Sequence, residues 1–564
     1  MEKIEDWSQL QIDMGAAEED PFGWMGTPMG NGIFSAKENG GITEDIFQLN
    51  HSTFWSGDPP YRDSMWKGEE KDGYGHTWEE RRKAHQKLVE TLKEAYREGI
   101  SQKERDILME SLAEITKGLW ESNYHSAFLP VGQLRLKFPG IFEAENYRRV
   151  LDLDQALSVI TFEKNGVGYR RETFISNPDQ VMVTRITNDS GCSMEMEAEL
   201  ALPPEMTGKS SDNQVTVQKE EQQIIMTGRA PYNFPANRWD ENRGILMEAR
   251  VRILLPRGGE VTESAAHKGL KVSGAKEILL IYTCTTSYKD NNTDPAHSGV
   301  DCHGIAECVI RQACDWSYTE LKEAHLKEYR SLFRRFWIEM EGNTIISSNG
   351  TPITPWEYAR HYQYGRYVNI SCERKNSIMA QGLLGMWCPV WLGPNEGAYF
   401  LNENMEKMQT LKGAGNLSDS SDGQYNVIKS WADIHTGQRT AEEIYGAELG
   451  SWMMAHSTGI WGKSGMWGET VEYGSWLAGG IWALDVLYDK YEYTQDKNLL
   501  RKYYPLLEGA VRFALSTLIE VDGVNGELKG YKVVAPAGSP EHWYWVNGTK
   551  VAFDIASACD TLLY

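Results

Sequence analysis

The stretch YRRVLDLDQALSVITFEKNGVGYRRETFISNPDQVMVTRIT, residues 147–187, decides the fold of the first half of this chain. Its apolar residues recur in short alternating runs, and Asn165-Gly166 separates two of these runs, a pattern typical of a β-hairpin. Similar short runs with turn signals between them extend from residue 131 to about residue 288. So many short strands predict a β-sandwich or a larger double sheet.

The sequence on either side of these strands has a different character. Residues 76–118 show helical periodicity with many charges, which predicts two solvated helices inserted into the β domain. Beyond Pro355 the chain reads as helices broken by Gly-, Pro- and Trp-rich loops, ending in an amphipathic helix over TKVAFDIASACDTLLY, residues 549–564. The predicted organisation is an N-terminal β-sandwich domain, a helical linker and a helical domain, at 1–290, 291–350 and 351–564.

Composition excludes several classes of partner. The 564 residues hold 57 Lys and Arg against 80 Asp and Glu, a net charge of −23 that repels nucleic acid and anionic membranes. No run approaches the ~18 apolar residues of a membrane span, and the N-terminus lacks a secretory signal. We therefore expect a cytoplasmic protein, with secretion of a longer precursor as the alternative. The sequence has no nucleotide-binding or zinc motif, so we expect neither a cofactor nor a metal. Its 20 Trp and 27 Tyr suit either a packed core or a neutral sugar ligand.

One loop carries a candidate acid. Glu541 follows Pro540 in VVAPAGSPEHWYW, residues 533–545, among aromatic side chains. A carboxyl held against aromatic faces loses solvation, so its pKa rises and it stays protonated near neutral pH. A general acid that protonates a glycosidic oxygen needs this property. The alternative is an exposed loop glutamate near a helix start.

Two further loops carry candidate ligand contacts. In MWCPVWLGPNEGAYFLNEN, residues 386–404, Asn402 and Asn404 stand two positions apart, so in an extended segment both amides face one side and can hold a water. In WMMAHSTGIWGKSGMWGE, residues 452–469, His456 is a candidate ligand contact. The indoles expected to stack on or line a sugar are Trp461, Trp467 and Trp387, and His542 is a further candidate contact. The alternative for the asparagines is an ordinary Asn-rich turn, and the alternative for the Trp residues is a purely structural role in packing at helix–loop junctions.

Read in order, these segments resemble glycoside hydrolase family 95, the inverting α-L-fucosidases. The resemblance rests on Pro28-Met29-Gly30-Asn31-Gly32, QLNHSTFWSGDPP at 48–60, the long stretch at 147–187 and APAGSPEHW at 535–543. It implies a β-sandwich, a helical linker and an (α/α)6 barrel that carries the active site. It also implies hydrolysis of terminal α-L-fucosyl or α-L-galactosyl linkages of an oligosaccharide, with inversion.

The same resemblance assigns roles residue by residue. Glu541 falls on the family's acid, Asn402 and Asn404 on its two water-activating asparagines, and His456 on the histidine of its H-N-T-D loop. The chain departs from the family at Gly459, where an aspartate is expected. It also departs after Asn404, where N-x-N-x-Q-M-N-Y-W continues as Met405-Glu406-Lys407-Met408-Gln409-Thr410.

The helical domain is also shorter than the family's barrel. The 213 residues from Pro352 onward are too few for twelve helices with their loops, so the sequence predicts an incomplete barrel. The aspartate that polarises the family's asparagines has no counterpart in this sequence. Two alternatives therefore stay open: a non-catalytic carbohydrate-binding or inactive truncated homologue, and a related α/α-barrel enzyme such as a disaccharide phosphorylase.

Overall fold

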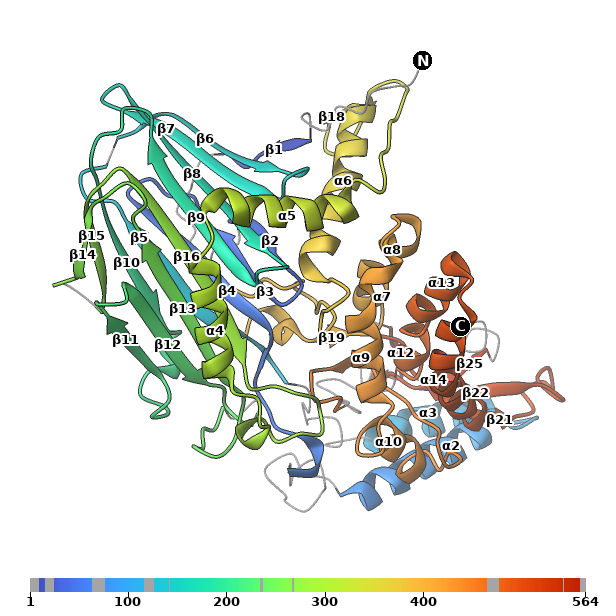
Figure 1. Ribbon diagram of the computed structural model, residues 1–564. Coiled ribbons are helices and arrows are strands. Elements are labelled where there is room, and N and C mark those ends of the chain that lie inside the picture. The colour runs from blue at the N-terminus through green and yellow to red at the C-terminus, as the bar shows by residue number, and fades with distance from the viewer. Residues whose placement is uncertain are drawn as a thin grey trace.

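The protein is described by a computed structural model of residues 1–564. The structure describes residues 10–15, 25–62, 77–115, 126–141, 143–233, 237–265, 268–463, 476–540 and 542–557. Figure 1 shows two large β-sheets on one side of the molecule and an array of helices on the other. This arrangement confirms the predicted order of β-rich and helical regions.

Among the described residues, nine antiparallel strands form the first sheet, in the order β1-β6-β7-β8-β9-β16-β13-β12-β11. Their bounds are β1 (Gln11–Asp13), β6 (Glu145–Asp152), β7 (Leu157–Lys164), β8 (Val167–Ser176), β9 (Val181–Asn188), β16 (Glu277–Thr286), β13 (Leu246–Leu254), β12 (Gln223–Arg229) and β11 (Gln214–Gln218). The stretch 147–187 supplies four neighbouring strands of this sheet, β6 to β9, and the predicted hairpin is formed by β7 and β8. Asn165 and Gly166 connect β7 to β8 with φ of 52° and 76°, the left-handed conformation that a two-residue turn needs.

The second sheet packs against the first. In the described chain its seven strands follow the order β14-β15-β10-β5-β4-β3-β2. Their bounds are β14 (Glu260–Glu263), β15 (Gly269–Ala275), β10 (Met194–Ala201), β5 (Phe128–Lys137), β4 (Glu44–Trp55), β3 (Phe34–Glu38) and β2 (Thr27–Gly30). Fully buried side chains from both sheets, such as Leu134 and Ala198 from one and Val251 and Ile278 from the other, share one core. The two sheets therefore form a sandwich.

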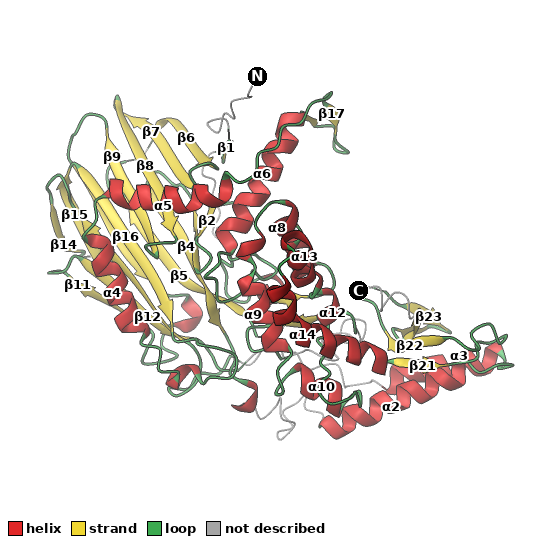
Figure 2. Ribbon diagram, turned by 45° about the vertical axis from the view of Figure 1, so that its right-hand side comes forward, coloured by secondary structure: helices red, strands yellow, loops and turns green. Residues whose placement is uncertain are grey.

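Two helices cover the outer face of the nine-stranded sheet (Figure 2). Helices α4 (Cys302–Cys314) and α5 (Tyr318–Phe333) follow the last strand of the sandwich. Ile310 of α4 and Leu321 of α5 are buried in a cluster with strand residues that include Phe174 and Ile281. These helices lead the chain from the sandwich to the helical region.

The predicted insertion forms two helices, α2 (Trp78–Ala95) and α3 (Gln102–Ile115). Thr77 caps α2 in a reciprocal capping box with Glu80, which explains where the helix begins. These helices are less solvated than the sequence suggested. Leu88 and Leu112 are fully buried in a cluster that also contains Ala535 and Phe553, near the far end of the chain.

The helical region occupies much of the chain from Pro355 to Ser516. Its described helices are α6 (Pro355–Cys372), α7 (Asn404–Gln409), α8 (Leu411–Ala414), α9 (Asp422–Trp431), α10 (Gly437–Glu443), α12 (Gly479–Trp482), α13 (Asp485–Thr494) and α14 (Lys497–Ser516). The short strand pairs are β17 (Ile345–Ile346) with β18 (Pro352–Ile353), and β19 (Tyr399–Phe400) with β20 (Ser457–Thr458). Within the described ranges, no helix has the length and hydropathy needed to cross a bilayer.

The C-terminal segment corrects one prediction. The helix expected at 549–564 is wrong for the described part, which forms β24 (Thr549–Val551) and β25 (Asp554–Ser557). These strands pair with β23 (Tyr544–Val546) and with β22 (Lys532–Ala537), which also pairs with β21 (Leu518–Glu520). Strand pairing with residues earlier in the chain overrides the local helical pattern, because β structure depends on partners that periodicity does not reveal.

Candidate functional site

The structure brings two of the three predicted loops together. Strand β19, which leads to Asn402, pairs antiparallel with β20, which follows His456. The Leu401 N–H donates to the His456 carbonyl oxygen at 2.7 Å. The Phe400 ring meets the His456 imidazole edge to face, with 4.9 Å between centroids. The Asn402 and His456 loops are therefore neighbours despite the sequence separation.

The third loop begins beside the second. Strand β22 precedes it, and Val534 of this strand is buried in the same cluster as Met453 and Ala455, which lead into His456. Beyond β22, the His542 N–H donates to the Ser539 carbonyl oxygen at 3.0 Å. Glu541, the predicted acid, lies outside the described residues. The strand that precedes it, β22, packs beside the segment that leads into His456.

Helix α12 packs closely against the segments that lead to Asn402 and His456, through Gly479. A Cβ on Gly479 would lie 2.4 Å from the Ala455 carbonyl oxygen and 3.0 Å from Leu401 Cβ, so only glycine fits there. The Trp476 indole N–H donates to the Leu401 carbonyl oxygen at 2.7 Å. The Gly480 N–H donates to the Met454 carbonyl oxygen at 3.0 Å. The backbone on both sides of the candidate site is therefore fixed by packing and hydrogen bonds.

The two predicted asparagines do not lie in an extended segment. Asn402 is in a turn, and Asn404 is the first residue of α7. The expectation that an i, i+2 spacing in a strand aligns their amides is therefore wrong at the level of local structure. The Asn402 Oδ1 is buried and accepts no hydrogen bond from the described residues. This oxygen is available to a water or a sugar hydroxyl.

Glu406 is a residue that the sequence analysis did not propose for the site. It lies on α7, is 3% exposed, and neither carboxyl oxygen has a hydrogen-bond donor among the described residues. Burial raises its pKa to about 8, and the Asp485 carboxylate at the start of α13 adds to the shift. Burial and Asp489 raise the pKa of Asp485 to about 6. No motif marks it in the sequence, because it is a single glutamate on a short helix.

Two of the predicted indoles are packed between sandwich and helices. Trp461 is 1% exposed, and its indole N–H donates to the Ser56 carbonyl oxygen at 2.9 Å. Trp387 is 7% exposed and donates to the Met29 carbonyl oxygen at 3.0 Å. Both rings are therefore buried in packing contacts and expose no face to a sugar. Trp467 lies outside the described residues, whereas His542 is exposed.

Exposed aromatic faces occur instead on the third loop and the strand that follows it. The Trp543 side chain is 41% exposed and the Trp545 side chain 65%. The Lys550 ammonium lies 4.1 Å from the centroid of the Trp543 ring. Within the described ranges, no group of three or more His, Cys, Asp or Glu side chains is arranged to hold a metal ion.

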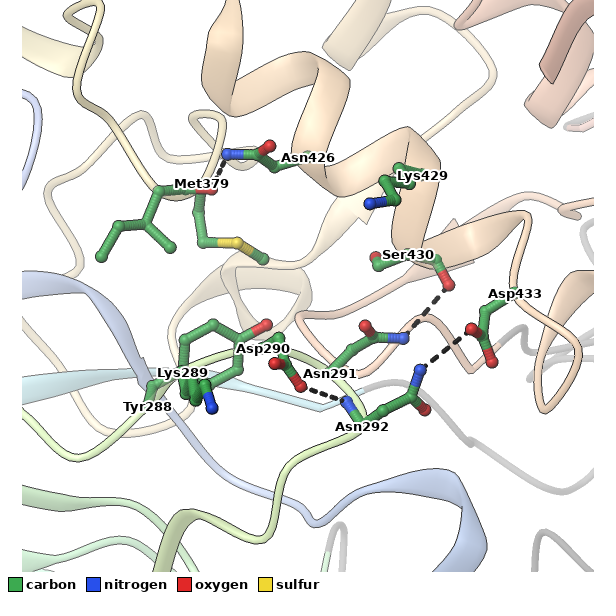
Figure 3. A pocket seen from close by; sticks show the side chains of 11 residues that line it. Tyr288, Lys289, Asp290, Asn291, Asn292, Met379, Asn426, Lys429, Ser430 and Asp433 are labelled. Carbon is green, nitrogen blue, oxygen red and sulfur yellow. Dashed lines mark hydrogen bonds between the residues drawn. The ribbon is translucent and has the colours of Figure 1, made fainter. Parts of the chain in front are cut away.

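A separate cavity of about 460 Å³ lies between the sandwich and the helices (Figure 3). Its lining comes from residues 288–292, which follow β16, from Ile378 and Met379, and from α9 and the turn after it as far as Asp433. None of the predicted site residues lines it. Tyr288 is its link to the His456 loop, because the Tyr288 hydroxyl donates to the Ile460 carbonyl oxygen at 3.4 Å and its ring meets Trp461 edge to face.

Comparison with known proteins gives two family matches. Residues 13–291 match the glycosyl hydrolase family 65 N-terminal domain, and residues 317–564 match the glycosyl hydrolase family 95 catalytic domain. Alpha-L-fucosidase 2 of Arabidopsis thaliana is 27% identical over 547 residues, which cover 92% of this chain and 59% of that protein. Probable alpha-fucosidase A of Aspergillus niger is 24% identical over 531 residues, which cover 91% and 61%. The chain thus spans about three fifths of the length of these curated relatives.

Solved structures share a more distant likeness. A putative kojibiose phosphorylase from the human microbiome aligns with a TM-score of 0.49 and 14% identity, over 74% of this chain and 53% of that one. A bacterial glucoamylase complexed with acarbose aligns with a TM-score of 0.37 and 9% identity, over 70% and 53%.

Proposed function

We propose, from the premise that this chain belongs to glycoside hydrolase family 95 as a divergent member, that it hydrolyses glycosidic bonds. The bond we assign is a terminal α-L-fucosyl, or closely related α-L-galactosyl, linkage of an oligosaccharide, cleaved with inversion. The names of its two relatives support the fucosyl assignment. The observation that supports the proposal is the pairing of β19 with β20, which joins the Asn402 and His456 loops, together with the packing of Val534 on β22, the strand before the third loop, with Met453 and Ala455.

In the proposed mechanism Glu541 is the general acid that protonates the glycosidic oxygen. Asn402 and Asn404 hold the water that attacks the opposite face of the sugar ring. An inverting site needs its two catalytic groups about 6.5–9.5 Å apart, so that the water fits between them and the sugar. The buried Oδ1 of Asn402, which has no hydrogen-bond donor among the described residues, supports this role because it provides an acceptor for a water proton. His456 and His542 are the proposed contacts to sugar hydroxyls.

We assign Glu406 as a positioning residue for that water. An amide oxygen is a weak base, so activation of the water requires a carboxyl nearby. Glu406 is on the same helix as Asn404, and its oxygens have no donor among the described residues. Besides burial, the Asp485 carboxylate contributes to the raised pKa of Glu406, so a second acid lies near this carboxyl.

We further propose that the helices between Pro355 and Ser516 are part of an (α/α)6 barrel. Contacts of α14 with α13 and with α12 support this arrangement, because such a barrel is built from paired helices. The loops that carry Asn402, His456 and Glu541 would then gather at one end of the barrel.

The test is turnover of 2′-fucosyllactose with release of fucose as the readout. We expect Glu541→Gln to abolish turnover while isothermal titration still detects binding. Glu403→Gln is the matched control, because Glu403 is exposed and pairs with Lys407. Unchanged turnover in the Glu541 variant would remove this residue from the mechanism. Binding without product by the unmodified chain would favour the non-catalytic carbohydrate-binding alternative.

Glu406→Gln gives a second, distinguishable result. A positioning residue affects the chemical step, so we expect kcat to fall about tenfold or more, with KM nearly unchanged and the basic limb of the pH profile altered. A purely structural role would lower the melting temperature without moving the pH profile. The two readouts together separate these interpretations.

A further inference from the structure

The cavity between the sandwich and α9 has the features of a ligand site that the proposed mechanism does not use. Its volume of about 460 Å³ falls within the range of small-molecule sites, roughly 300–1,000 Å³. Figure 3 shows side chains from residues 288–292 on one side and from α9 on the other, directed toward the space between them. All of its lining residues are described, and none of them belongs to the three loops of the candidate active site.

Three amides line the cavity and are held in place by the protein. The Asn291 Nδ2 donates to the Ser430 carbonyl oxygen at 3.3 Å, and the Asn292 Nδ2 donates to Asp433 Oδ2 at 2.9 Å. The Asn426 Nδ2 donates to the Ile378 carbonyl oxygen at 3.1 Å. These bonds orient each amide. The Asn292 Oδ1 is buried and has no donor among the described residues, so it is an acceptor that a ligand hydroxyl can satisfy.

The cavity is lined by equal numbers of positively and negatively charged side chains. Lys289 and Lys429 contribute two ammonium groups, and neither forms an ion pair with any described residue. Asp290 and Asp433 contribute two carboxylates, which accept main-chain N–H groups of Asn292 and His435 at 3.0 and 2.9 Å. An anion would meet both carboxylates and a cation both ammonium groups. A neutral ligand with many hydroxyls can donate to the carboxylates and accept from the lysines without that cost.

Part of the cavity lining is apolar. Tyr288 and Met379 line it, and both side chains are almost fully buried. Sugars combine apolar C–H faces with a rim of hydroxyls, and a cavity lined by an aromatic ring and by amides matches both properties. A nucleotide or a phosphorylated sugar would place its charge beside the carboxylates of Asp290 and Asp433.

We propose that this cavity is an accessory carbohydrate-binding site that takes a neutral saccharide of one or two pyranose units. The inference rests on the chemistry of the cavity and does not require the proposed hydrolysis. Tyr288 also packs against Trp461 and donates to the Ile460 carbonyl oxygen, so the occupied cavity would stiffen the segment that follows His456.

The experiment uses lactose, a neutral disaccharide without a fucosyl unit, and the full chain. Saturation-transfer NMR and isothermal titration measure its binding to the unmodified protein and to three variants. Asn292→Ala removes the unsatisfied acceptor, Lys429→Met removes an exposed donor, and Lys93→Met on α2 is the matched control. We expect Asn292→Ala and Lys429→Met to weaken binding roughly three- to tenfold each, because each loses about one hydrogen bond. The control should bind as the unmodified chain does.

The outcomes separate this site from the proposed active site. Lactose binding that weakens in both cavity variants, and not in Lys93→Met, supports the proposal whether or not the chain hydrolyses a fucoside. Absence of lactose binding, or equal binding by Lys429→Met and Lys93→Met, would overturn it. Binding of inorganic phosphate in place of lactose, with the same sensitivity to Lys429→Met, would also overturn it, because the site would then select an anion. Lys429 is exposed, so this variant tests the site even if Asn292→Ala fails to fold.

Discussion

Two buried glutamates in different parts of the molecule have opposite surroundings. Glu38, on β3 in the sandwich, is 1% exposed and accepts hydrogen bonds from the Ser158 and Thr173 hydroxyls. Glu406, on α7 in the helical region, is 3% exposed and has no donor among the described residues. Burial raises the pKa of both, to about 7 for Glu38, where Asp45 adds to the shift, and to about 8 for Glu406.

The difference in hydrogen-bond donors indicates the role of each glutamate. Removing a carboxyl from water costs free energy, and hydrogen bonds from the protein offset part of that cost. The donors around Glu38 are built into the sheets, so its role is structural. Glu406 lacks such donors in the described structure, as expected of a group that meets a water or a substrate hydroxyl. A buried polar group without partners is therefore a better guide to function here than burial or charge alone.

The largest expected effect concerns the sandwich. Arg171 pairs with Asp45 at 3.0 Å, both side chains are at most 2% exposed, and the pair lies beside Glu38. Arg171→Leu leaves a buried carboxylate without its cation, so we expect a loss of about 3–5 kcal/mol of unfolding free energy. Arg170→Leu is the control, because Arg170 is 48% exposed, and its loss should stay below about 1 kcal/mol. Urea denaturation measures both, and equal losses would contradict the comparison.

A smaller effect, which depends on pH, is expected at Glu406. The folded pKa of about 8 lies above the value of 4.5 for an unperturbed glutamate. Between these pH values the folded chain keeps a proton that the unfolded chain has released, so Glu406 lowers stability as pH rises through this window. Glu406→Gln removes the effect. We expect the variant to gain stability over the unmodified chain at pH 8.5, by on the order of a few kcal/mol, and to gain little at pH 4.5.

Thermal unfolding at both pH values measures this change. Glu403→Gln, on the exposed side of the same turn, should give the same difference from the unmodified chain at pH 4.5 and pH 8.5. A Glu406→Gln variant whose gain does not grow with pH would show that Glu406 is ionised or partnered in the folded protein.

The smallest of the stability effects concerns the close packing of Gly479 on α12 against the segments that lead to His456 and Asn402. Gly479→Ala places a methyl group 2.4 Å from the Ala455 carbonyl oxygen, and we expect a loss of roughly 1–3 kcal/mol together with reduced turnover. Gly365→Ala on α6 is the matched control, because its added methyl would meet only Leu411 Cδ2 at 3.4 Å. That control should be neutral or slightly stabilising, by about 0.5–1 kcal/mol, since alanine favours a helix interior. Similar melting temperatures for the two variants would contradict the tight packing at Gly479.

Much of the fold could be predicted from local chemistry. The hairpin at Asn165-Gly166 and the capped helix after Thr77 follow from signals within a few residues. The strands at 544–557 could not be predicted, because their pairing partners include β22, more than ten residues earlier. The burial of α2 and α3 against residues 535–553 depends on contacts across more than 400 positions, which periodicity does not encode.

Part of the candidate site could likewise be predicted from the sequence, and part could not. The loops of Asn402 and His456 could be singled out from their residue types, and the structure joins them through β19 and β20. The roles of Asn404 and Glu541 remain predictions that rest on the resemblance. Glu406 was missed because an isolated glutamate on a short helix carries no motif. The accessory cavity was missed because residues 288–292 and α9 are over 100 positions apart and meet only in the folded chain.

The most direct test of the proposed reaction is proton NMR of 2′-fucosyllactose during the first minutes of incubation with the chain, before mutarotation equilibrates the product. A water held by Asn402 and Asn404 opposite the acid predicts that β-L-fucose appears first and that Glu541→Gln yields none. Initial release of α-L-fucose, or release of β-L-fucose at an undiminished rate by Glu541→Gln, would contradict the account.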